Sequence, residues 1–252
     1  MARYDFRSPR LFVEAPLSER AAVSLDAAQA SYLVNVLRLK AGATVLVFNG
    51  RDGEWRAQLA ATARKRVTLE VVERTREQTA SGDLEYLFSP LKHARLDYMV
   101  QKAVEMGVSR LAPVIMAHTQ AERVNLGRMR ANAIEAAEQC GVLNIPEIAE
   151  PKKFASLTRG WKPDRLLVFC DEEAEVKDPV GALSSARGGG IAGRLPVSVL
   201  IGPEGGFAEA ERAALLKLPN VLRLALGPRI LRADTAAVAA LTLVQAALGD
   251  WR

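Results

Sequence analysis

The segment IGPEGGF at residues 201–207, together with LGPRILRADTAA at residues 226–237, decides the fold that we expect for this chain. Each segment follows a short apolar run, VSVL at 197–200 and VLRLA at 221–225, which predicts a buried strand. Each then passes through Gly-Pro into sequence with helical character. Two such turns near the end of an α/β domain predict one ligand pocket, because ligands of open α/β sheets bind outside the carboxyl ends of strands.

The first loop is rich in glycine, with Gly202, Gly205 and Gly206 around Pro203. Glycine allows either a tight turn or a close approach of a ligand to the backbone. Both interpretations stay open from the residues alone, since an ordinary turn has the same composition. The loop matches neither the dinucleotide fingerprint G-x-G-x-x-G nor the phosphate-binding loop that ends in Gly-Lys-Ser/Thr.

The paired loops resemble the C-terminal motifs of the SPOUT methyltransferases, and most closely those of the RsmE family. RLFVEAP at 10–16, YLVNVLRLKAGATVLVFNG at 32–50, VQKAVEMGV at 100–108 and EQCG at 138–141 follow in that family's order. The resemblance therefore covers nearly the whole chain. Two positions depart from the family pattern, which usually has Glu in place of Asp234 and often Arg in place of Val142.

This resemblance implies a fold and an activity. The fold is a C-terminal α/β SPOUT domain with a deep trefoil knot, in which segment 226–237 passes through the loop around 200–207, plus a small N-terminal PUA-like β-barrel that binds RNA. The activity is methylation of N3 of a uridine, nucleotide 1498 of 16S ribosomal RNA, with S-adenosylmethionine as methyl donor. The small ribosomal subunit is then the partner, and the enzyme is a homodimer.

Composition and charge agree with a protein that acts on an anionic partner. The formal net charge is +5, and the first 51 residues contain the arginines Arg3, Arg7, Arg10, Arg20, Arg38 and Arg51. Two cysteines in 252 residues make no disulfide framework, and with two histidines they show no metal-ligand spacing. No apolar run reaches the ~18 residues of a membrane span, and MARYDFRSPR lacks the apolar core of a signal peptide. We therefore expect a cytoplasmic protein without metal.

Hydrophobic periodicity divides the chain into two domains. Residues 1–75 combine strand candidates at 44–48, 55–60 and 67–72 with helical spacing at 26–39. The polar stretch ERTREQTASGD at 73–83 is the best linker, and it separates a domain of residues 1–75 from one of residues 76–252. In the second domain, strands near 84–89, 111–116 and 166–170 alternate with helices at 93–107 and 126–140. A final apolar helix, residues 235–248, is predicted to be buried or to form a subunit interface.

The two loops and the end of the strand LLVFC provide the candidate cofactor site. We predict that the cofactor is held by Phe169, Cys170, Asp171, Ile201, Gly202, Pro203, Glu204, Gly205, Gly206, Leu226, Gly227, Ile230, Leu231 and Thr235. Phe169 could equally be core, and Glu204 could cap the next helix instead of holding a cofactor hydroxyl or amine.

The candidate catalytic residues are Arg232 and Asp234. N3 of uracil must lose a proton, and a guanidinium such as that of Arg232 or Arg229 could stabilise the resulting anion, although phosphate binding is an equal alternative. Asp234 could act as base, or it could cap the last helix, as Thr235 also could. The candidate RNA contacts are Arg10, Arg38, Lys92, Arg95, Arg123 and Asn125.

Three function classes remain compatible with the residues. The methyltransferase, on this or another RNA base, competes with a non-catalytic RNA-binding protein and with a nucleotide-binding enzyme whose Gly-rich loop holds phosphates. Saturable binding of S-adenosylmethionine separates the first class from the other two.

Overall fold

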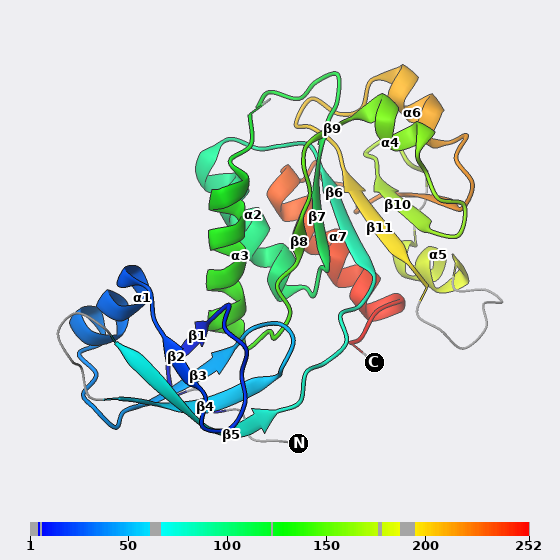
Figure 1. Cartoon of the computed structure of the whole chain (residues 1–252). Helices are drawn as coiled ribbons and strands as arrows, with labels where there is room; N and C mark the ends of the chain where they lie inside the picture. The colour runs from blue at the N-terminus through cyan, green and yellow to red at the C-terminus, as the bar shows by residue number, and fades with distance from the viewer. Residues whose placement is uncertain are drawn as a thin grey trace. The chain divides into compact units, whose positions relative to one another are not determined.

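The computed structural model describes residues 5, 7–60, 67–121, 123–175, 178–186 and 195–251, without the side chain of His93 (Figure 1). The chain forms two compact units. The first contains Met1–Ala80 and Ala137–Ile145, and the second contains Ser81–Ala136 and Pro146–Arg252. Each unit has its own sheet.

The first unit is built on a five-stranded sheet in the order β1-β3-β4-β5-β2. The strands are β1 (Arg10–Phe12), β2 (Ala22–Ser24), β3 (Thr44–Phe48), β4 (Glu54–Leu59) and β5 (Thr68–Arg76). β1 runs parallel to β3, and the other pairs are antiparallel. A turn follows β3, with Gly50 at φ +78° and the side chain of Asn49 accepting from the backbone N–H of Asp52.

All five strands contribute to one core on a single side of the sheet. Leu11, Val23, Val47, Ala57 and Leu69 come from the five strands in turn and lie in the same buried cluster. Short helices close this side: α1 (Ala27–Ser31) continues directly into the π-helix η1 (Tyr32–Val36). The predicted helix at 26–39 is thus present in two pieces, and Asp26 caps the first by accepting from the backbone N–H of Gln29.

The second unit contains a parallel sheet of seven strands in the order β12-β10-β11-β6-β7-β8, with β9 also paired to β7. The strands are β6 (Leu84–Phe88), β7 (Arg110–Ile115), β8 (Glu147–Ile148), β9 (Lys152–Lys153), β10 (Leu166–Cys170), β11 (Val197–Ile201) and β12 (Val221–Leu224). Of the apolar runs predicted as buried strands, β10 and β11 lie inside the sheet and are almost completely enclosed. β12 instead lies at the edge of the sheet and is mostly half-buried, which corrects the prediction for that run.

Helices cover both faces of this sheet (Figure 1). They are α2 (His93–Glu105), α3 (Leu126–Cys140), α4 (Phe154–Arg159), α5 (Pro179–Ala186), α6 (Glu209–Leu215) and α7 (Ala233–Ala247). Leu87 and Phe169 face the core cluster that includes Leu215 of α6. The neighbouring Tyr86 points to the opposite face, where its hydroxyl contacts Sδ of Met99 in α2. Alternate strand residues therefore fill two separate layers.

Two further segments differ from the sequence prediction. The polar stretch expected to begin a linker at residue 73 starts as strand, because β5 continues to Arg76 through pairing with β4. The last helix begins at Ala233, two residues earlier than predicted. Asp234 and Thr235 therefore lie inside its first turn and neither caps it, which corrects that prediction.

Candidate active site

A cavity of about 380 Å³ opens where three neighbouring strands of the second unit end. β10 lies between β11 and β12, so the loops that follow these three strands meet at one edge of the sheet. The cavity is lined by Arg95, Cys170, Asp171, Glu172, Ile201, Gly202, Pro203, Glu204, Gly206, Phe207, Leu226, Gly227, Pro228, Arg229, Ile230, Leu231, Arg232, Ala233 and Ala236. The prediction that the two Gly-Pro loops share one pocket agrees with this geometry.

The first loop needs glycine at two of its positions. Gly206 has φ +72°, a conformation that residues with a side chain rarely adopt, and its N–H donates to the carbonyl of Pro203 at 2.9 Å. A Cβ on Gly202 would lie 2.9 Å from the ring of Phe207. Gly205 does not line the cavity, and a Cβ there would lie 3.2 Å from the Cβ of His118. The first loop is therefore a tight turn whose glycines are needed for its own packing, and Gly202 and Gly206 also line the cavity.

The second loop exposes its backbone. Gly227 has φ +99°, and no heavy atom lies within 4 Å of the position of an added Cβ. Ile230 is 89% exposed, which is unusual for a large apolar side chain at the edge of a cavity. Such an exposed side chain is available to cover a ligand that binds against the loop.

Asp171, at the end of β10, is the most heavily bonded side chain of the cavity wall. Its carboxylate is 1% exposed and accepts from Nε of Arg212 and Nε of Arg223, both at 2.8 Å. Burial alone would raise the pKa of Asp171, but the hydrogen bonds from Arg212, Glu173 and Arg223 outweigh it and hold the pKa below its ordinary value. The carboxylate thus ties β10 to α6 and β12 and is an anion at neutral pH.

Cys170 precedes Asp171 and also lines the cavity. Burial, with a smaller contribution from the charge of Asp171, raises the pKa of its thiol to about 12. Since only the thiolate is a strong nucleophile, Cys170 is unsuited to covalent catalysis and contributes apolar surface instead.

Most of the predicted cofactor residues line the cavity. These are Cys170, Asp171, Ile201, Gly202, Pro203, Glu204, Gly206, Leu226, Gly227, Ile230 and Leu231. Phe169 does not, because its fully buried ring packs edge-on against Phe207 in the core. Gly205 faces His118, and Thr235 is exposed on the first turn of α7 away from the lining. Glu204 does not cap α6, since Glu211 accepts from the backbone of Ala208 there.

The two predicted catalytic residues are placed differently. Arg232 is exposed at the N-terminus of α7 and lines the cavity. Asp234 does not line it, and its carboxylate accepts from the backbone N–H of Thr235 at 2.9 Å. A carboxylate in the first turn stabilises the helix through the helix dipole, so the geometry favours a structural role for Asp234.

The predicted RNA contacts also separate into groups. Arg38, Lys92, Arg123 and Asn125 are exposed, and Asn125 in addition accepts from the backbone of Arg128 at the start of α3. Arg95 is half-buried and forms an ion pair with Glu204 at the cavity.

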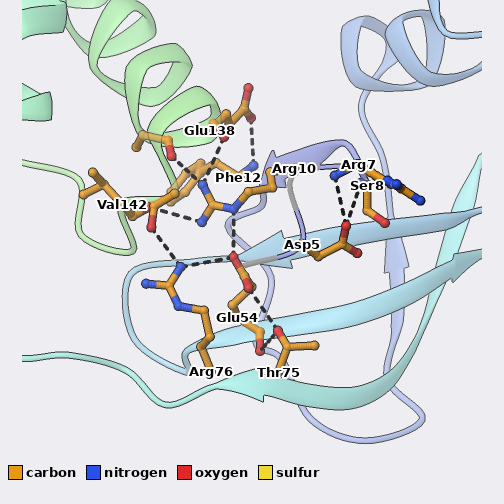
Figure 2. A network of polar contacts seen from close by, with 12 residues as sticks. Asp5, Arg7, Ser8, Arg10, Phe12, Glu54, Thr75, Arg76, Glu138 and Val142 are labelled. Carbon is orange, nitrogen blue, oxygen red and sulfur yellow. Dashed lines mark hydrogen bonds and ion pairs between the residues drawn. The ribbon is translucent and has the colours of Figure 1, made fainter. Parts of the chain in front are cut away.

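Arg10 is the exception, because it is buried in a network of the first unit (Figure 2). Its Nε donates to the carboxylate of Glu54 at 2.7 Å. Its other nitrogens donate to carbonyl oxygens at the end of α3, those of Ala137, Glu138 and Val142. A cation at a helix C-terminus compensates the carbonyls that have no partner within the helix. Arg10 therefore holds protein groups rather than a phosphate, and the predicted RNA contact conflicts with this placement.

Sequence reasoning missed Arg212, Arg223 and Glu211. The sequence indicates a role for Arg223, because a charged residue inside the apolar strand VLRL is expected to have a partner of opposite charge. The sequence gives no such indication for Glu211: it is buried, and one carboxylate oxygen accepts from Ala208 while the other accepts from the backbone of Ala117 after β7. It thereby joins the start of α6, just after the first loop, to the end of β7.

Comparison with known proteins identifies the family. A family model described as RNA methyltransferase domain matches residues 78–245, and a second model, described as RNA methyltransferase PUA domain, matches residues 25–72. The chain belongs to this RNA methyltransferase family. Among the described residues, no helix is long and apolar enough to cross a bilayer, and no cluster of potential metal ligands occurs.

Curated relatives match this chain along nearly its whole length. The ribosomal RNA small subunit methyltransferase E of Rickettsia conorii is 27% identical over 237 residues, which cover 94% of each chain. The protein of the same name from Synechocystis sp. is 30% identical and covers 95% of this chain and 78% of its own.

Solved structures share the fold. A methyltransferase of Legionella pneumophila, solved with S-adenosylmethionine bound, has a TM-score of 0.81 at 26% identity and covers 96% of this chain and 98% of its own. The ribosomal RNA small subunit methyltransferase E of Neisseria gonorrhoeae has a TM-score of 0.78 at 24% identity, and the match covers 98% of this chain and 100% of its own. The predicted fold class, a SPOUT-type α/β domain with an N-terminal PUA-like domain, is confirmed, while the knot stays a prediction.

Proposed function

We propose that this RNA methyltransferase transfers a methyl group from S-adenosylmethionine to N3 of one uridine in 16S ribosomal RNA, uridine 1498, during maturation of the small subunit. The observation that carries the proposal is the cavity formed by two Gly-Pro loops at three neighbouring strand ends, in a chain that aligns along its length with a structure solved with that methyl donor. Such an enzyme works in the cytoplasm, where small subunits are assembled.

The residues present fit the methyl donor. The cavity volume of about 380 Å³ lies within the ~300–1,000 Å³ of small-molecule sites. The second loop is open at Gly227, where no heavy atom lies within 4 Å of an added Cβ, so an adenosine can lie against its backbone. The donor, when bound, supplies a methyl group on a sulfonium that leaves readily.

The chain must position the acceptor and stabilise its charge. Positioning two reactants in line can lower a barrier by roughly 7–11 kcal/mol. Uracil that has lost its N3 proton carries negative charge on two carbonyl oxygens, and the guanidinium of Arg232, exposed at the cavity, can donate to them with fixed geometry. That charge develops in the reaction, so the contact strengthens toward the transition state.

RNA binding is assigned to both domains. We propose that residues 1–75 form an RNA-binding domain and residues 76–252 the methyltransferase domain, with exposed Arg38, Lys92, Arg123 and Asn125 as RNA contacts. Phosphate contacts of this kind make affinity fall as the salt concentration rises.

The experiment is single-turnover methylation of small subunits from cells that lack the gene, with the product located by mass mapping. For Arg232→Ala we expect the saturated rate to fall about 10²-fold, the scale seen when one donor to an oxyanion is removed. The affinity for S-adenosylmethionine, measured by calorimetry, should change little. An intact rate with weakened donor binding would make Arg232 a binding residue, and a methyl group on another base would refute the assigned target.

A further inference from the structure

A second cavity, of about 400 Å³, lies beside the first in the same unit. It is lined by Ser89, Pro90, Leu91, Lys92, Ala94, Arg95, Gln120, Pro203 and Glu204. Three of these residues, Arg95, Pro203 and Glu204, also line the first cavity. The two cavities are therefore neighbours that share one wall.

The shared wall is an ion pair that can open. Arg95 of α2 and Glu204 of the first loop are paired, and the side chain of each is 37% exposed. Ion pairs with this exposure contribute only about 0–1 kcal/mol, because water and salt screen them. A ligand that offers either partner a better contact can therefore replace the pair at small cost.

The rest of the second cavity suits a flat, uncharged base. Pro90, Leu91 and Ala94 supply apolar surface, and Gln120 and Lys92 supply hydrogen-bonding groups. The floor of this cavity is held in place by Ser89. Its backbone N–H donates to the carbonyl oxygen of Ile201, and its hydroxyl is hydrogen-bonded to the hydroxyl of Thr119 at 2.9 Å. These contacts join the ends of β6 and β11 to the turn after β7.

We propose that this second cavity receives the acceptor uracil, and that the Arg95–Glu204 pair opens so that Glu204 becomes the base that takes the N3 proton. The inference rests on the proposed function. Glu204 is the carboxylate of the described residues that lines both cavities, so it can lie between the methyl donor and the acceptor. Arg95, released from Glu204, donates to one carbonyl oxygen of the uracil, and the other oxygen faces the first cavity, which Arg232 lines.

The proton transfer balances without a further reactant. The N3–H bond breaks, the proton moves to a carboxylate oxygen of Glu204, and the electron pair stays on N3. That pair forms the new N–C bond to the methyl group, while the electrons of the broken C–S bond return to sulfur. The protonated Glu204 then loses its proton to water, and its pairing with Arg95 is restored.

The test compares Glu204→Gln and Glu204→Ala with wild type in the single-turnover assay, alongside calorimetric titration with S-adenosylmethionine. For Glu204→Gln we expect the saturated rate to fall about 10²- to 10⁴-fold, the contribution of a positioned base, with the donor affinity within about threefold of wild type. Added formate should restore part of the rate of Glu204→Ala, because a small carboxylate can occupy the vacated space. Glu209→Gln is the matched control: its carboxylate is 85% exposed on α6 and lines neither cavity.

The outcomes separate this inference from the proposed function. If Glu204→Gln keeps the wild-type rate at saturation but binds the donor more than tenfold more weakly, Glu204 is a cofactor ligand and the inference is wrong. A rate of Glu204→Ala that formate leaves unchanged also contradicts it. If wild type itself methylates no uridine of the small subunit, the proposed function fails first.

Discussion

Asp171→Asn tests whether the buried ion pairs hold the wall of the cavity together. The substitution keeps the size of the side chain but removes the charge that faces Arg212 and Arg223. Arg212 offers an internal comparison, because it also pairs with Glu209 at the same distance, 2.8 Å, as with Asp171. The two carboxylates differ in exposure, which is 1% for Asp171 and 85% for Glu209.

The difference in exposure sets the expected energies. Breaking a buried ion pair by removal of one partner costs about 3–5 kcal/mol, whereas an exposed pair contributes about 0–1 kcal/mol. Arg212 keeps Glu209 and Glu173 as partners in Asp171→Asn, so we expect the lower limit, about 3 kcal/mol. For a chain of this length that corresponds to a melting temperature lower by roughly 6–12 °C. Glu209→Gln should lower it by less than about 4 °C.

The same network predicts a pH dependence. The folded state lowers the pKa of Asp171 below its ordinary value of 3.8, so the unfolded chain binds the proton more readily. The stabilisation by this carboxylate is therefore fully present above that value and is lost as the pH falls through the folded pKa. The difference in stability between wild type and Asp171→Asn should accordingly be constant near neutral pH and shrink below about pH 4.

Thermal unfolding, followed by circular dichroism at several pH values, measures the melting temperatures of wild type, Asp171→Asn and Glu209→Gln and how their differences depend on pH. The reasoning would be refuted if Glu209→Gln destabilised the protein as much as Asp171→Asn, because distance rather than burial would then set the energy. It would fail equally if the cost of Asp171→Asn were the same at pH 3 and pH 7.

Three further predictions concern other parts of the chain. Arg10→Met should lower the free energy of unfolding by about 3–5 kcal/mol, since it leaves buried Glu54 with weaker partners; urea denaturation measures this. Gly206→Ala should weaken calorimetric binding of S-adenosylmethionine at least tenfold, because φ +72° is strained for alanine and the new Cβ would lie 3.1 Å from Oε1 of Glu172. The homodimer implied by the resemblance predicts that Leu243→Glu on α7 yields monomers or insoluble protein, and light scattering that finds monomeric wild type would contradict it.

The positions of the central elements were predictable because they depend on local patterns. Apolar runs such as LLVFC at 166–170 form strands that are buried on both faces. The predicted helix at 126–140 ends at Cys140, and Gly141 follows it with a φ of +68°, the left-handed conformation that commonly terminates helices. The shared cavity was predictable from the repeated Gly-Pro turn, since strand ends in a parallel sheet meet at one edge. The order of the strands has no local signal and required the structure.

The partners of charged side chains were not predictable, because they depend on contacts between distant segments. Arg10 and Arg38 look alike in the sequence, as basic residues in a β-rich domain. Arg10 is bonded to Glu54 and to carbonyls more than 120 residues away, whereas Arg38 is exposed. Asp171 follows the strand LLVFC and Asp234 lies in the second loop segment, and nothing in the sequence separates their roles. Asp171 is enclosed by two arginines, whereas Asp234 bonds only locally in the described structure.

This distinction changes how the basic composition should be interpreted. A net charge of +5 suggests many cations for RNA, but the guanidinium groups of Arg10, Arg212 and Arg223 neutralise carboxylates inside the protein. An arginine and a carboxylate paired in this way cancel in the formal charge and contribute little to the field at the surface, so the value of +5 does not show which cations face RNA. The cations at the cavities are of another kind: Arg232 is exposed, and Arg95 is held by one exposed ion pair of small energy. The salt dependence of RNA binding should therefore respond to Arg38, Lys92 and Arg123, and substitution of the ion-paired Arg10, Arg212 or Arg223 should change stability instead.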